Sequence, residues 1–306
     1  MGKNVLVVGS INVDYVIHTE RLPKLGETLT GSDFAMNFGG KGANQAIAIA
    51  KAGCTVKMLG AVGKDHGGDL AIGNLTSYGV DCSSVLRRNS ATGAAVITVC
   101  GGDNHIILDE GANATVTPAC VREAEALFAW ADYVVLQLEI PVETVLAAAR
   151  TAKEKGAKVI FNPAPVKPVP QELFGFVDWV IPNEFEAGIL TGISQNTDAD
   201  ARAAIDVLRD MGCGNVLITL GKRGSAYLVD GKLHRTGVFD VPVVDTTAAG
   251  DSFIGGLCTK FCEGASIDDA VYYATATSAM TIGRSGASVS IPTADEVTDF
   301  LKTHKI

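Results

Sequence analysis

The 306-residue chain lacks a basic stretch: 25 Lys and Arg residues stand against 34 Asp and Glu residues, for a net charge of -9. A protein whose main partner is nucleic acid usually presents a basic face, so we expect no nucleic-acid partner. No apolar run approaches the roughly 18 residues that suggest a membrane span, and the first residues have no signal-like apolar core. We therefore expect no membrane partner, a cytoplasmic location and a small-molecule ligand.

The cysteine pattern supports neither a disulfide framework nor a zinc site. There are seven cysteines, an odd number, and none forms a C-x-x-C pair. We interpret them as the reduced thiols of a cytoplasmic protein. The five histidines are far apart in the sequence and have no metal-ligand spacing, so we assign them no role.

Familiar nucleotide-binding motifs are also missing. The chain has no G-x-x-x-x-G-K-[ST] sequence, which excludes a P-loop NTPase, and no G-x-G-x-x-G sequence, which leaves a Rossmann dinucleotide site unsupported. The H-R-D and D-F-G sequences of protein kinases are absent as well. If the chain binds a nucleotide, it must therefore bind the phosphates with a different motif.

What is present is an alternation of short β-branched runs with longer helical patterns. Such alternation is typical of βαβ units and a buried parallel sheet, and it predicts a doubly wound α/β fold with a mostly parallel sheet flanked by helices. The predicted strands are 5–8, 56–59, 133–136, 159–161, 179–181 and 216–219. The predicted helices are 43–52, 69–78, 118–129, 142–155, 198–211, 250–263 and 267–282.

Two segments interrupt this alternation with a period of two residues and predict a small accessory sheet. It would comprise about 13–37 and 93–109, within a single α/β domain spanning 1–306. The first segment leaves after the first strand and returns at a glycine-rich turn, so it would hang over the carboxyl ends of the strands, where open α/β sheets bind ligands. We interpret this sheet as a lid; an edge extension or a dimer face is the alternative.

The most informative segment is 244–253, where a turn of small residues runs into an apolar helix. Helix N-termini leave amides unsatisfied and carry partial positive charge. Small side chains at Ala248, Ala249 and Gly250 would let an anion approach these amides, which predicts a phosphate or oxyanion cradle. Asp251 at its edge could cap the helix or accept a proton from a substrate hydroxyl.

Two further segments place polar groups at the same edge of the sheet. The glycine-rich segment 37–45 carries Lys41 just before the predicted helix 43–52 and Asn44 in the first turn of that helix. Glycines suit a tight turn on steric grounds alone, but the added polar groups favour binding. Asn12 and Asp14 follow the first strand; both are common turn formers, and together they also offer the donors and acceptors that a polyol needs.

These motifs together resemble the ribokinase, or PfkB, family of carbohydrate kinases over nearly the whole chain. The similarity is carried by GSINVD at 9–14, FGGKGANQA at 38–46, LQLEIP at 136–141, NPAP at 162–165, PNEFEA at 182–187, TLGKRG at 219–224 and VDTTAAGDSF at 244–253. The glycine-rich and DTxAAGD signatures are typical of the family. GSINVD combined with GGKGANQA and LQLE is typical of its ribokinases. The resemblance implies a ribokinase-like fold with a β-sheet lid.

The resemblance also implies an activity, namely ATP-dependent phosphorylation of the O5 hydroxyl of D-ribose to D-ribose 5-phosphate. ATP would be the co-substrate, with Mg²⁺ as cofactor and K⁺ as an activating cation. Asp251 would be the catalytic base, and the residues before it would form the anion hole, namely Ala248, Ala249 and Gly250. The sugar would be held by Asn12, Asp14, Gly40, Lys41, Asn44 and Glu139.

Nucleotide and metal roles follow from the same resemblance. Nucleotide binding would involve Asn183, Thr219 and Gly221, and Glu186 would be linked to Mg²⁺. The monovalent cation would be held at Asp245 and Thr247 and completed near Ile282, Arg284, Ala287 and Ser290. Ribokinase lids often pair with a second subunit, so we expect a homodimer through the lid, with an apolar face formed by Val96, Thr98, Cys100, Ile106 and Leu108.

Several alternatives remain open. Related kinases act on deoxyribose, fructose, 2-keto-3-deoxygluconate or nucleosides. Glu139 argues against a nucleoside, whose base needs apolar contacts there, whereas deoxyribose would keep most of the sugar contacts. A non-catalytic sugar-binding module is a second possibility; the loss of Asp251 or Gly250 would have favoured it, and both are present. A nicotinamide-dependent dehydrogenase is disfavoured by the missing dinucleotide motif.

Overall fold

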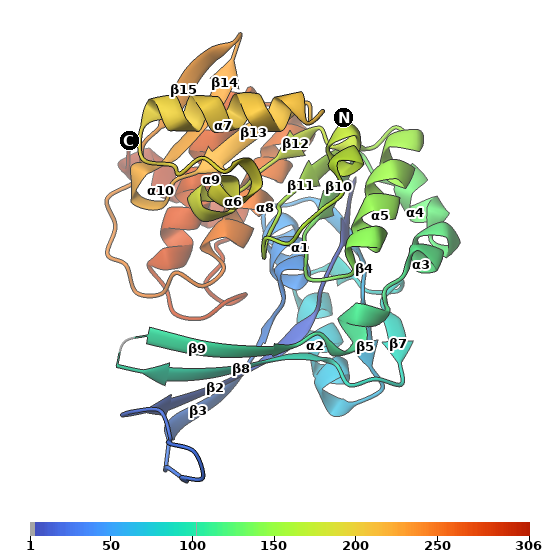
Figure 1. Cartoon of the computed structure of the whole chain (residues 1–306), viewed down its shortest axis with the longest axis vertical. Helices are drawn as coiled ribbons and strands as arrows, with labels where there is room; N and C mark the ends of the chain where they lie inside the picture. Colours follow the sequence, from blue (N-terminus) through green and yellow to red (C-terminus); the bar gives the residue numbers. More distant parts are fainter. Residues whose placement is uncertain (1–3, 102) are drawn as a thin grey trace.

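The structure is a computed structural model that describes residues 4–101 and 103–306. Its centre is a nine-stranded sheet in the order β15-β14-β13-β12-β11-β10-β1-β4-β6 (Figure 1). Neighbouring strands from β6 to β13 are parallel, and β13, β14 and β15 pair antiparallel. The strands are β1 Asn4–Val8, β4 Thr55–Leu59, β6 Val80–Asp81, β10 Tyr133–Leu136, β11 Lys158–Phe161, β12 Trp179–Val180, β13 Asn215–Thr219, β14 Ser225–Val229 and β15 Lys232–Thr236.

Helices cover both faces of this sheet because its central strands are apolar on both sides. In β1, Val5 and Val7 belong to one buried cluster, and Leu6 and Val8 belong to the other. The first cluster includes residues of α1 Lys41–Lys51, α2 His66–Ser77, α8 Ala249–Glu263 and α9 Ile267–Ile282. The second includes residues of α3 Pro118–Glu123, α4 Glu125–Trp130, α5 Val142–Glu154, α6 Glu184–Thr191 and α7 Asp198–Asp210.

The predicted doubly wound α/β fold is confirmed, and the elements differ from the prediction in several places, among them the short strand β6, which was not predicted. The helix expected over 118–129 is interrupted at Ala124, whose backbone leaves the helical region between α3 and α4. Helices α6 and α10 Ala294–Thr303 were not predicted, nor was the β14–β15 hairpin. The Asp230-Gly231 dipeptide at the hairpin turn is the sequence signal that identifies it.

A separate four-stranded sheet projects from the body in the order β3-β2-β8-β9 (Figure 1). Its strands, β2 Asn12–Thr19, β3 Ser32–Gly39, β8 Gly93–Cys100 and β9 Asp103–Asp109, fall in the two segments predicted to form an accessory sheet. We call it the accessory sheet. Short elements complete the chain: β5 Ala61–Gly63, β7 Leu86–Arg88, η1 Gly111–Thr115, η2 Gln171–Phe176 and η3 Gly221–Arg223.

The register of the accessory sheet corrects the predicted apolar face. Val96 lies opposite Ile107 and Thr98 lies opposite His105. Since directly paired residues share a face of the sheet and neighbours alternate, Ile106 and Leu108 lie on the other face from Val96, Thr98 and Cys100. The prediction was wrong because even-numbered residues of β8 pair with odd-numbered residues of β9, as Cys100 does with Asp103, and a register that differs by one residue reverses the face.

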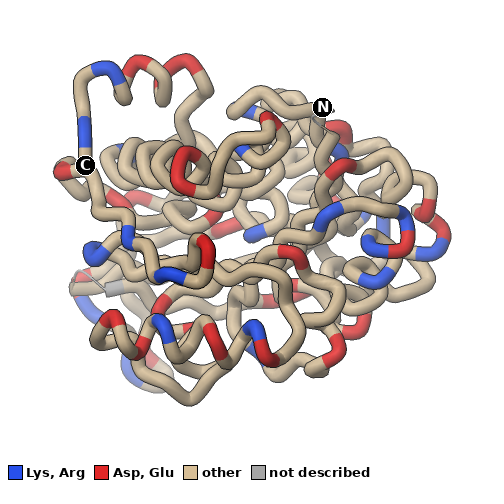
Figure 2. Tube along the Cα trace, turned by 90° about the horizontal axis from the view of Figure 1, so that it is seen from above, with Lys and Arg blue, Asp and Glu red and all other residues tan. Residues whose placement is uncertain are grey.

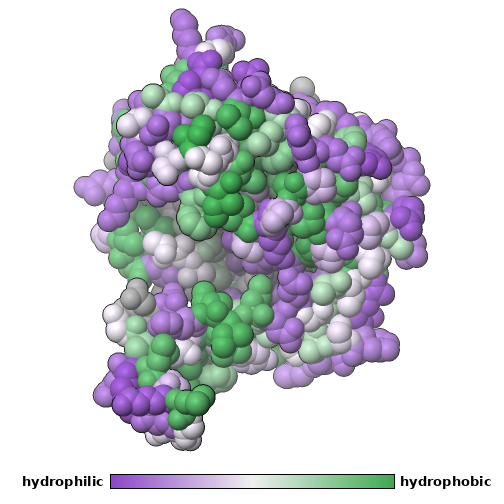
Figure 3. Space-filling model, in the orientation of Figure 1, coloured by the Kyte–Doolittle hydropathy of each residue, from purple (hydrophilic) through white to green (hydrophobic). Residues whose placement is uncertain are grey.

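The surface is mixed in charge and in polarity. Figure 2 shows Lys and Arg residues interspersed with Asp and Glu residues along the trace. Figure 3 shows apolar residues gathered on the accessory sheet and a recess between this sheet and the body. Among the helices of the described residues, none is long and apolar enough to span a bilayer.

Candidate active site

The candidate site forms where the chain leaves the large sheet after β1 and returns at α1. Asn12 pairs with Gly39 across β2 and β3, and the amide of Ala43 donates to the Ser10 carbonyl at 2.9 Å. Gly40 lies between them with φ of 88°, and a Cβ there would come within 2.9 Å of the Asn12 nitrogen. Glycine is therefore required at this crossing for both conformation and space.

Glu139 follows β10 and is held against this crossing. Its Oε2 accepts hydrogen bonds from the Ser10 hydroxyl at 2.5 Å and from the Lys41 amide at 2.9 Å. Asp14 lies nearby on β2, with its carboxylate packed so closely over Gly39 that a Cβ there would be 2.2 Å from Oδ2. Burial, with the charge of Glu139 adding to it, raises the pKa of Asp14 to about 6.

The orientation of Asn12 is fixed by a residue that the sequence did not single out. The buried Asn113, in η1 just after the accessory sheet, donates from Nδ2 to Asn12 Oδ1 at 2.8 Å and accepts from the Ile11 amide at 2.9 Å. Because its oxygen is already engaged, Asn12 presents its amide nitrogen as the group free to meet a ligand. Nothing local in the sequence distinguishes Asn113, whose partners are about 100 positions away.

Asp251 is buried in the first turn of α8 and does not act as the helix cap. Its Oδ2 accepts from Asn44 Nδ2 at 3.1 Å, and its Oδ1 accepts from Gln45 Nε2 at 2.9 Å. Both donors lie on α1, which packs against α8. Of the two roles that the sequence left open for Asp251, the structure therefore excludes capping.

The start of α8 has the predicted form of an anion cradle, with one difference. Ala248 occupies the N-cap position in the left-handed region with φ of 59°, and no side chain of the described residues caps the helix. The amide of Ala249, expected to be bare, donates to the Thr246 carbonyl at 3.2 Å. Ala248, Ala249 and Gly250 line a cavity of about 200 Å³ together with Asp251.

Lys41 brings positive charge to the same cavity. Burial lowers the pKa of Lys41, but the carboxylates of Asp251, Glu139 and Glu186 together outweigh burial, so its pKa lies above the usual value. Lys41 is therefore an ammonium ion facing three acidic groups. The acidic groups outnumber the single ammonium group, so an anionic ligand would need an accompanying cation at this site.

Glu186 lines the cavity from α6, where it forms a capping box with Asn183. Its two oxygens accept from the Asn183 amide at 2.8 Å and from Asn183 Nδ2 at 2.9 Å. Burial raises the pKa of Glu186, and the bond from Asn183 and the charge of Lys41 partly offset that effect. The acidic group is thus fixed at the cavity wall by the start of a helix.

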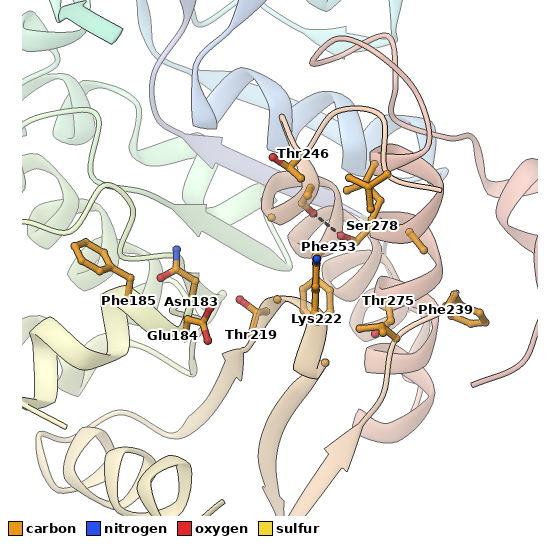
Figure 4. A pocket seen from close by; sticks show the side chains of 18 residues that line it. Asn183, Glu184, Phe185, Thr219, Lys222, Phe239, Thr246, Phe253, Thr275 and Ser278 are labelled. Atoms are coloured by element: carbon orange, nitrogen blue, oxygen red, sulfur yellow. Dashed lines mark hydrogen bonds between the residues drawn. The ribbon is translucent and has the colours of Figure 1, made fainter. Parts of the chain in front are cut away.

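A larger cavity of about 490 Å³ continues from the small one (Figure 4). The two share a wall, formed by Asn183, Thr219, Thr246, Ala249, Gly250 and Phe253. Asn183 and Thr219 form an isolated parallel β-bridge. Gly221, two positions after Thr219, has a φ of 53°. The far part is lined mainly by apolar groups, among them Phe239 and Ile282. A long cavity that is apolar at one end and polar at the other fits a nucleotide.

The residues predicted to hold a monovalent cation lie beside the start of α8. Asp245 accepts from the Thr247 amide at 2.9 Å and from the Gly286 amide at 3.0 Å. Burial raises the pKa of Asp245, but these bonds outweigh it and lower the pKa overall. The Ile282 carbonyl accepts from the Val244 and Asp245 amides.

The rest of the predicted cation set is engaged within the protein. The Ser290 hydroxyl donates to the Ala287 carbonyl at 2.7 Å, and the Arg284 guanidinium donates to Glu296 at 2.7 Å. The bond from Gly286 to Asp245 nevertheless brings the loop after α9 against the turn before α8. The structure thus places these predicted residues in one region, with carboxylate, carbonyl and hydroxyl oxygens.

Comparison with known proteins gives a consistent result. The family model described as "pfkB family carbohydrate kinase" matches residues 2–294. The chain is 40% identical to the ribokinase of Haemophilus influenzae over 304 residues, covering 99% of both chains, and 33% identical to the deoxyribokinase of Salmonella typhi, covering 99% of this chain and 100% of the other. A structure of Arabidopsis thaliana ribokinase complexed with ribose and ATP superposes with a TM-score of 0.94 at 34% identity, covering 99% of each chain.

Proposed function

Because the chain belongs to the pfkB family of carbohydrate kinases, we propose that it is a ribokinase that transfers the γ-phosphoryl group of ATP to O5 of D-ribose. One observation carries the proposal. Asp251, Lys41 and the residues at the start of α8 line one small cavity, and this cavity shares a wall with the larger, nucleotide-sized one. The similarity to ribokinases over the full length supports the choice of sugar.

In the proposed reaction, the O5 oxygen of ribose attacks the γ-phosphorus of ATP. The O5–P bond forms, the bond from the γ-phosphorus to the bridging oxygen breaks, and ADP leaves. Asp251 accepts the proton of the O5 hydroxyl as this bond forms. The amides at the start of α8 and the Lys41 ammonium group stabilise the charge on the transferring group, which is the main task of an enzyme in phosphoryl transfer.

The sugar is held, in this proposal, by polar groups at the crossing of the accessory sheet and α1. Asp14 and Glu139 accept hydrogen bonds from sugar hydroxyls, while Asn12 donates through its free amide nitrogen. Asn44 completes the set, since its buried Oδ1 has no partner among the described residues and would accept from a sugar hydroxyl. Gly40 and Lys41 position the backbone of the crossing against the ring.

The residues present fit the two metal ions that the family implies. Glu186 offers a fixed carboxylate at the cavity wall, as a hard cation such as Mg²⁺ requires. Mg²⁺ bound there would neutralise phosphate charge. For K⁺, Asp245 and the hydroxyl of Thr247 would act with oxygens at the end of α9 and in the loop after it, namely those of Ile282, Arg284, Ala287 and Ser290. Such a cation would hold that loop against the turn that presents the amides of α8.

We extend the proposal to a homodimer formed through the accessory sheet. On one face of this sheet, Val96 is 47% exposed and Ile107 is 74% exposed. Met36 and Phe34 continue this face on β3, where Phe34 stacks on Tyr15 with ring centroids 6.4 Å apart. An exposed apolar patch of this kind fits burial against a second copy.

Other partners and the location follow the same argument. The mixed charges of the surface support a small-molecule enzyme without a nucleic-acid or membrane partner. Six of the cysteines are free thiols, which suits the cytoplasm, namely Cys82, Cys100, Cys120, Cys213, Cys258 and Cys262.

The direct test is a coupled ADP-release assay over ribose, deoxyribose, fructose, 2-keto-3-deoxygluconate and adenosine, with the phosphorylated position identified by NMR. We expect the highest kcat/KM for ribose, a product phosphorylated at C5, and a lower rate when Na⁺ replaces K⁺ at saturating Mg²⁺. A preference for deoxyribose would move the assignment to the alternative represented by the Salmonella relative. Turnover of none of the five would contradict the proposal.

A further inference from the structure

A chain of amide side chains extends from Asp251, with Gln45 and Gln137 in the interior and Asn162 at the wall of the small cavity. Gln45 and Gln137 are fully buried, and neither was assigned a role from the sequence. Gln45 Nε2 donates both to Asp251 Oδ1 at 2.9 Å and to Asn162 Oδ1 at 3.2 Å. Gln137 Nε2 donates to Gln45 Oε1 at 2.7 Å. All the polar atoms of Gln45 are therefore engaged.

The orientation of every amide in this chain follows from one backbone carbonyl. The Ile181 carbonyl can only accept, so Asn162 must turn its Nδ2 toward it, and the two atoms are 2.9 Å apart. Asn162 Oδ1 then faces Gln45, which must turn its own nitrogen toward Asn162. The same nitrogen reaches Asp251, while Gln45 Oε1 faces Gln137. The Ile181 carbonyl, just after β12, thus determines the orientation of Asn162 and through it that of Gln45, so that Gln45 presents an N–H donor to Asp251.

This arrangement has a chemical consequence for Asp251. Its two oxygens each receive an N–H donor, from Gln45 on Oδ1 and from Asn44 on Oδ2. Two N–H donors, one on each oxygen, hold the carboxylate group in one orientation. A proton on the α1 side would face these N–H groups, so the lone pairs left for a proton are those on the cavity side.

We propose that Gln45 is a positioning residue for Asp251: it fixes the carboxylate in one orientation and directs its proton-accepting lone pairs toward the substrate. Gln137 and Asn162 serve by holding the Gln45 amide in the required orientation. The inference rests on the proposed function, because it assigns Asp251 the role of base. Gln45 and Gln137 line neither cavity, so they would act on the reaction only through Asp251.

The test replaces Gln45 while leaving the groups that contact the ligands unchanged. In Gln45→Leu, we expect kcat to fall about ten- to a hundredfold, as for loss of a hydrogen bond to a charged group, while the KM for ribose changes less than about threefold. The acid side of the kcat/KM profile should move to higher pH, because the carboxylate has lost a donor. Gln45→Glu should move it further, since a second carboxylate then faces Asp251.

Two companion variants separate positioning from stability. Gln137→Leu frees the Gln45 amide to turn over and should give a smaller effect of the same kind, about three- to tenfold in kcat. Thr144→Val is the matched control. It removes another buried hydrogen bond, from the Thr144 hydroxyl to the Val116 carbonyl at 2.6 Å, and should leave kcat and the pH profile unchanged even if stability falls.

A second readout does not depend on turnover. The side-chain carboxyl carbon of Asp251, assigned by its loss in Asp251→Asn, can be followed by ¹³C NMR as the pH is changed. Its titration should move to higher pH in Gln45→Leu and stay in place in Thr144→Val. If the Asp251 carboxyl signal titrated at the same pH in Gln45→Leu as in the wild-type protein, the inference would be overturned. If the wild-type protein phosphorylated no sugar, the proposed function would be overturned instead, whatever the titration shows.

Discussion

The large sheet and the accessory sheet contribute to one site but are built differently. Strand β1 buries its side chains on both faces, within two clusters that include helices of either side. The accessory sheet leaves apolar side chains such as Ile106 and Ile107 exposed, one on each face. Asp251 and its supporting amides belong to the first region, whereas Asp14 belongs to the second. The proposed chemistry thus lies in the region that is buried on both faces, and part of the proposed sugar contact lies in the sheet that exposes apolar side chains.

This contrast predicts a separation of effects. Changes at Asp251 should alter the rate without altering self-association, and changes on the accessory sheet should alter sugar affinity or association with less effect on the chemical step. The following variants test that separation.

The largest effect is expected for Asp251→Asn. Loss of the general base should lower kcat by about 10²- to 10⁴-fold, with the melting temperature close to that of the unchanged protein because the amide retains the size of the carboxylate. Steady-state kinetics with ribose and ATP measure the rate, and differential scanning calorimetry checks the fold. Retained activity would remove Asp251 from the mechanism.

Asp14→Ala should act mainly on the sugar. Loss of a charged acceptor worth about 1.5 to 3 kcal/mol per hydrogen bond weakens ribose binding roughly 10- to 150-fold, with ATP binding unchanged. Since the pKa of Asp14 is raised to about 6, ribose affinity of the unchanged protein should also fall as the pH drops below about 6, and this dependence should be weaker in the variant. Calorimetric titrations at pH 5 and pH 8 measure both; an effect on ATP alone would argue against the assignment.

Ile107→Asp should weaken the proposed dimer. A charge placed on the apolar face, at the exposed Ile107 of the edge strand β9, should raise the dimer dissociation constant at least about tenfold, as measured by analytical ultracentrifugation. Ile106→Asp is the matched control, since Ile106 is also exposed but lies on the opposite face. If Ile106→Asp dissociates the dimer and Ile107→Asp does not, the interface lies on the other face of the sheet.

The smallest effect concerns stability without ligand. The folded-state pKa of Asp14 lies above its ordinary value of 3.8, so the unfolded chain loses this proton first as the pH rises. The free energy of unfolding therefore falls between about pH 4 and pH 6 because of this group, and the loss persists at higher pH. Asp14→Asn should be more stable by about 1 kcal/mol at pH 8, after allowance for partial exposure, and should show no gain at pH 3.5. Urea denaturation at the two pH values checks both; an equal gain at each would refute the cause.

The sequence predicted the layers and the location of the site, because strand periodicity and motifs are local. It could not predict the register of β8 on β9, which depends on the turn between them, nor the break at Ala124, where no glycine or proline marks the end of α3. Asn113, Gln137 and Asn162 were missed for a different reason. A buried amide looks like any other polar residue until the fold brings together partners that are distant in sequence.

The crossing of the chain at Asn12 and Gly39 has a consequence for how the protein can be rebuilt. The excursion through β2 and β3 begins and ends at one point, and its tip at 20–31 is mostly exposed. New chain termini or an inserted fluorescent domain at that tip would leave the strands of both sheets continuous. The tip is therefore the natural place to attach a reporter for sugar binding.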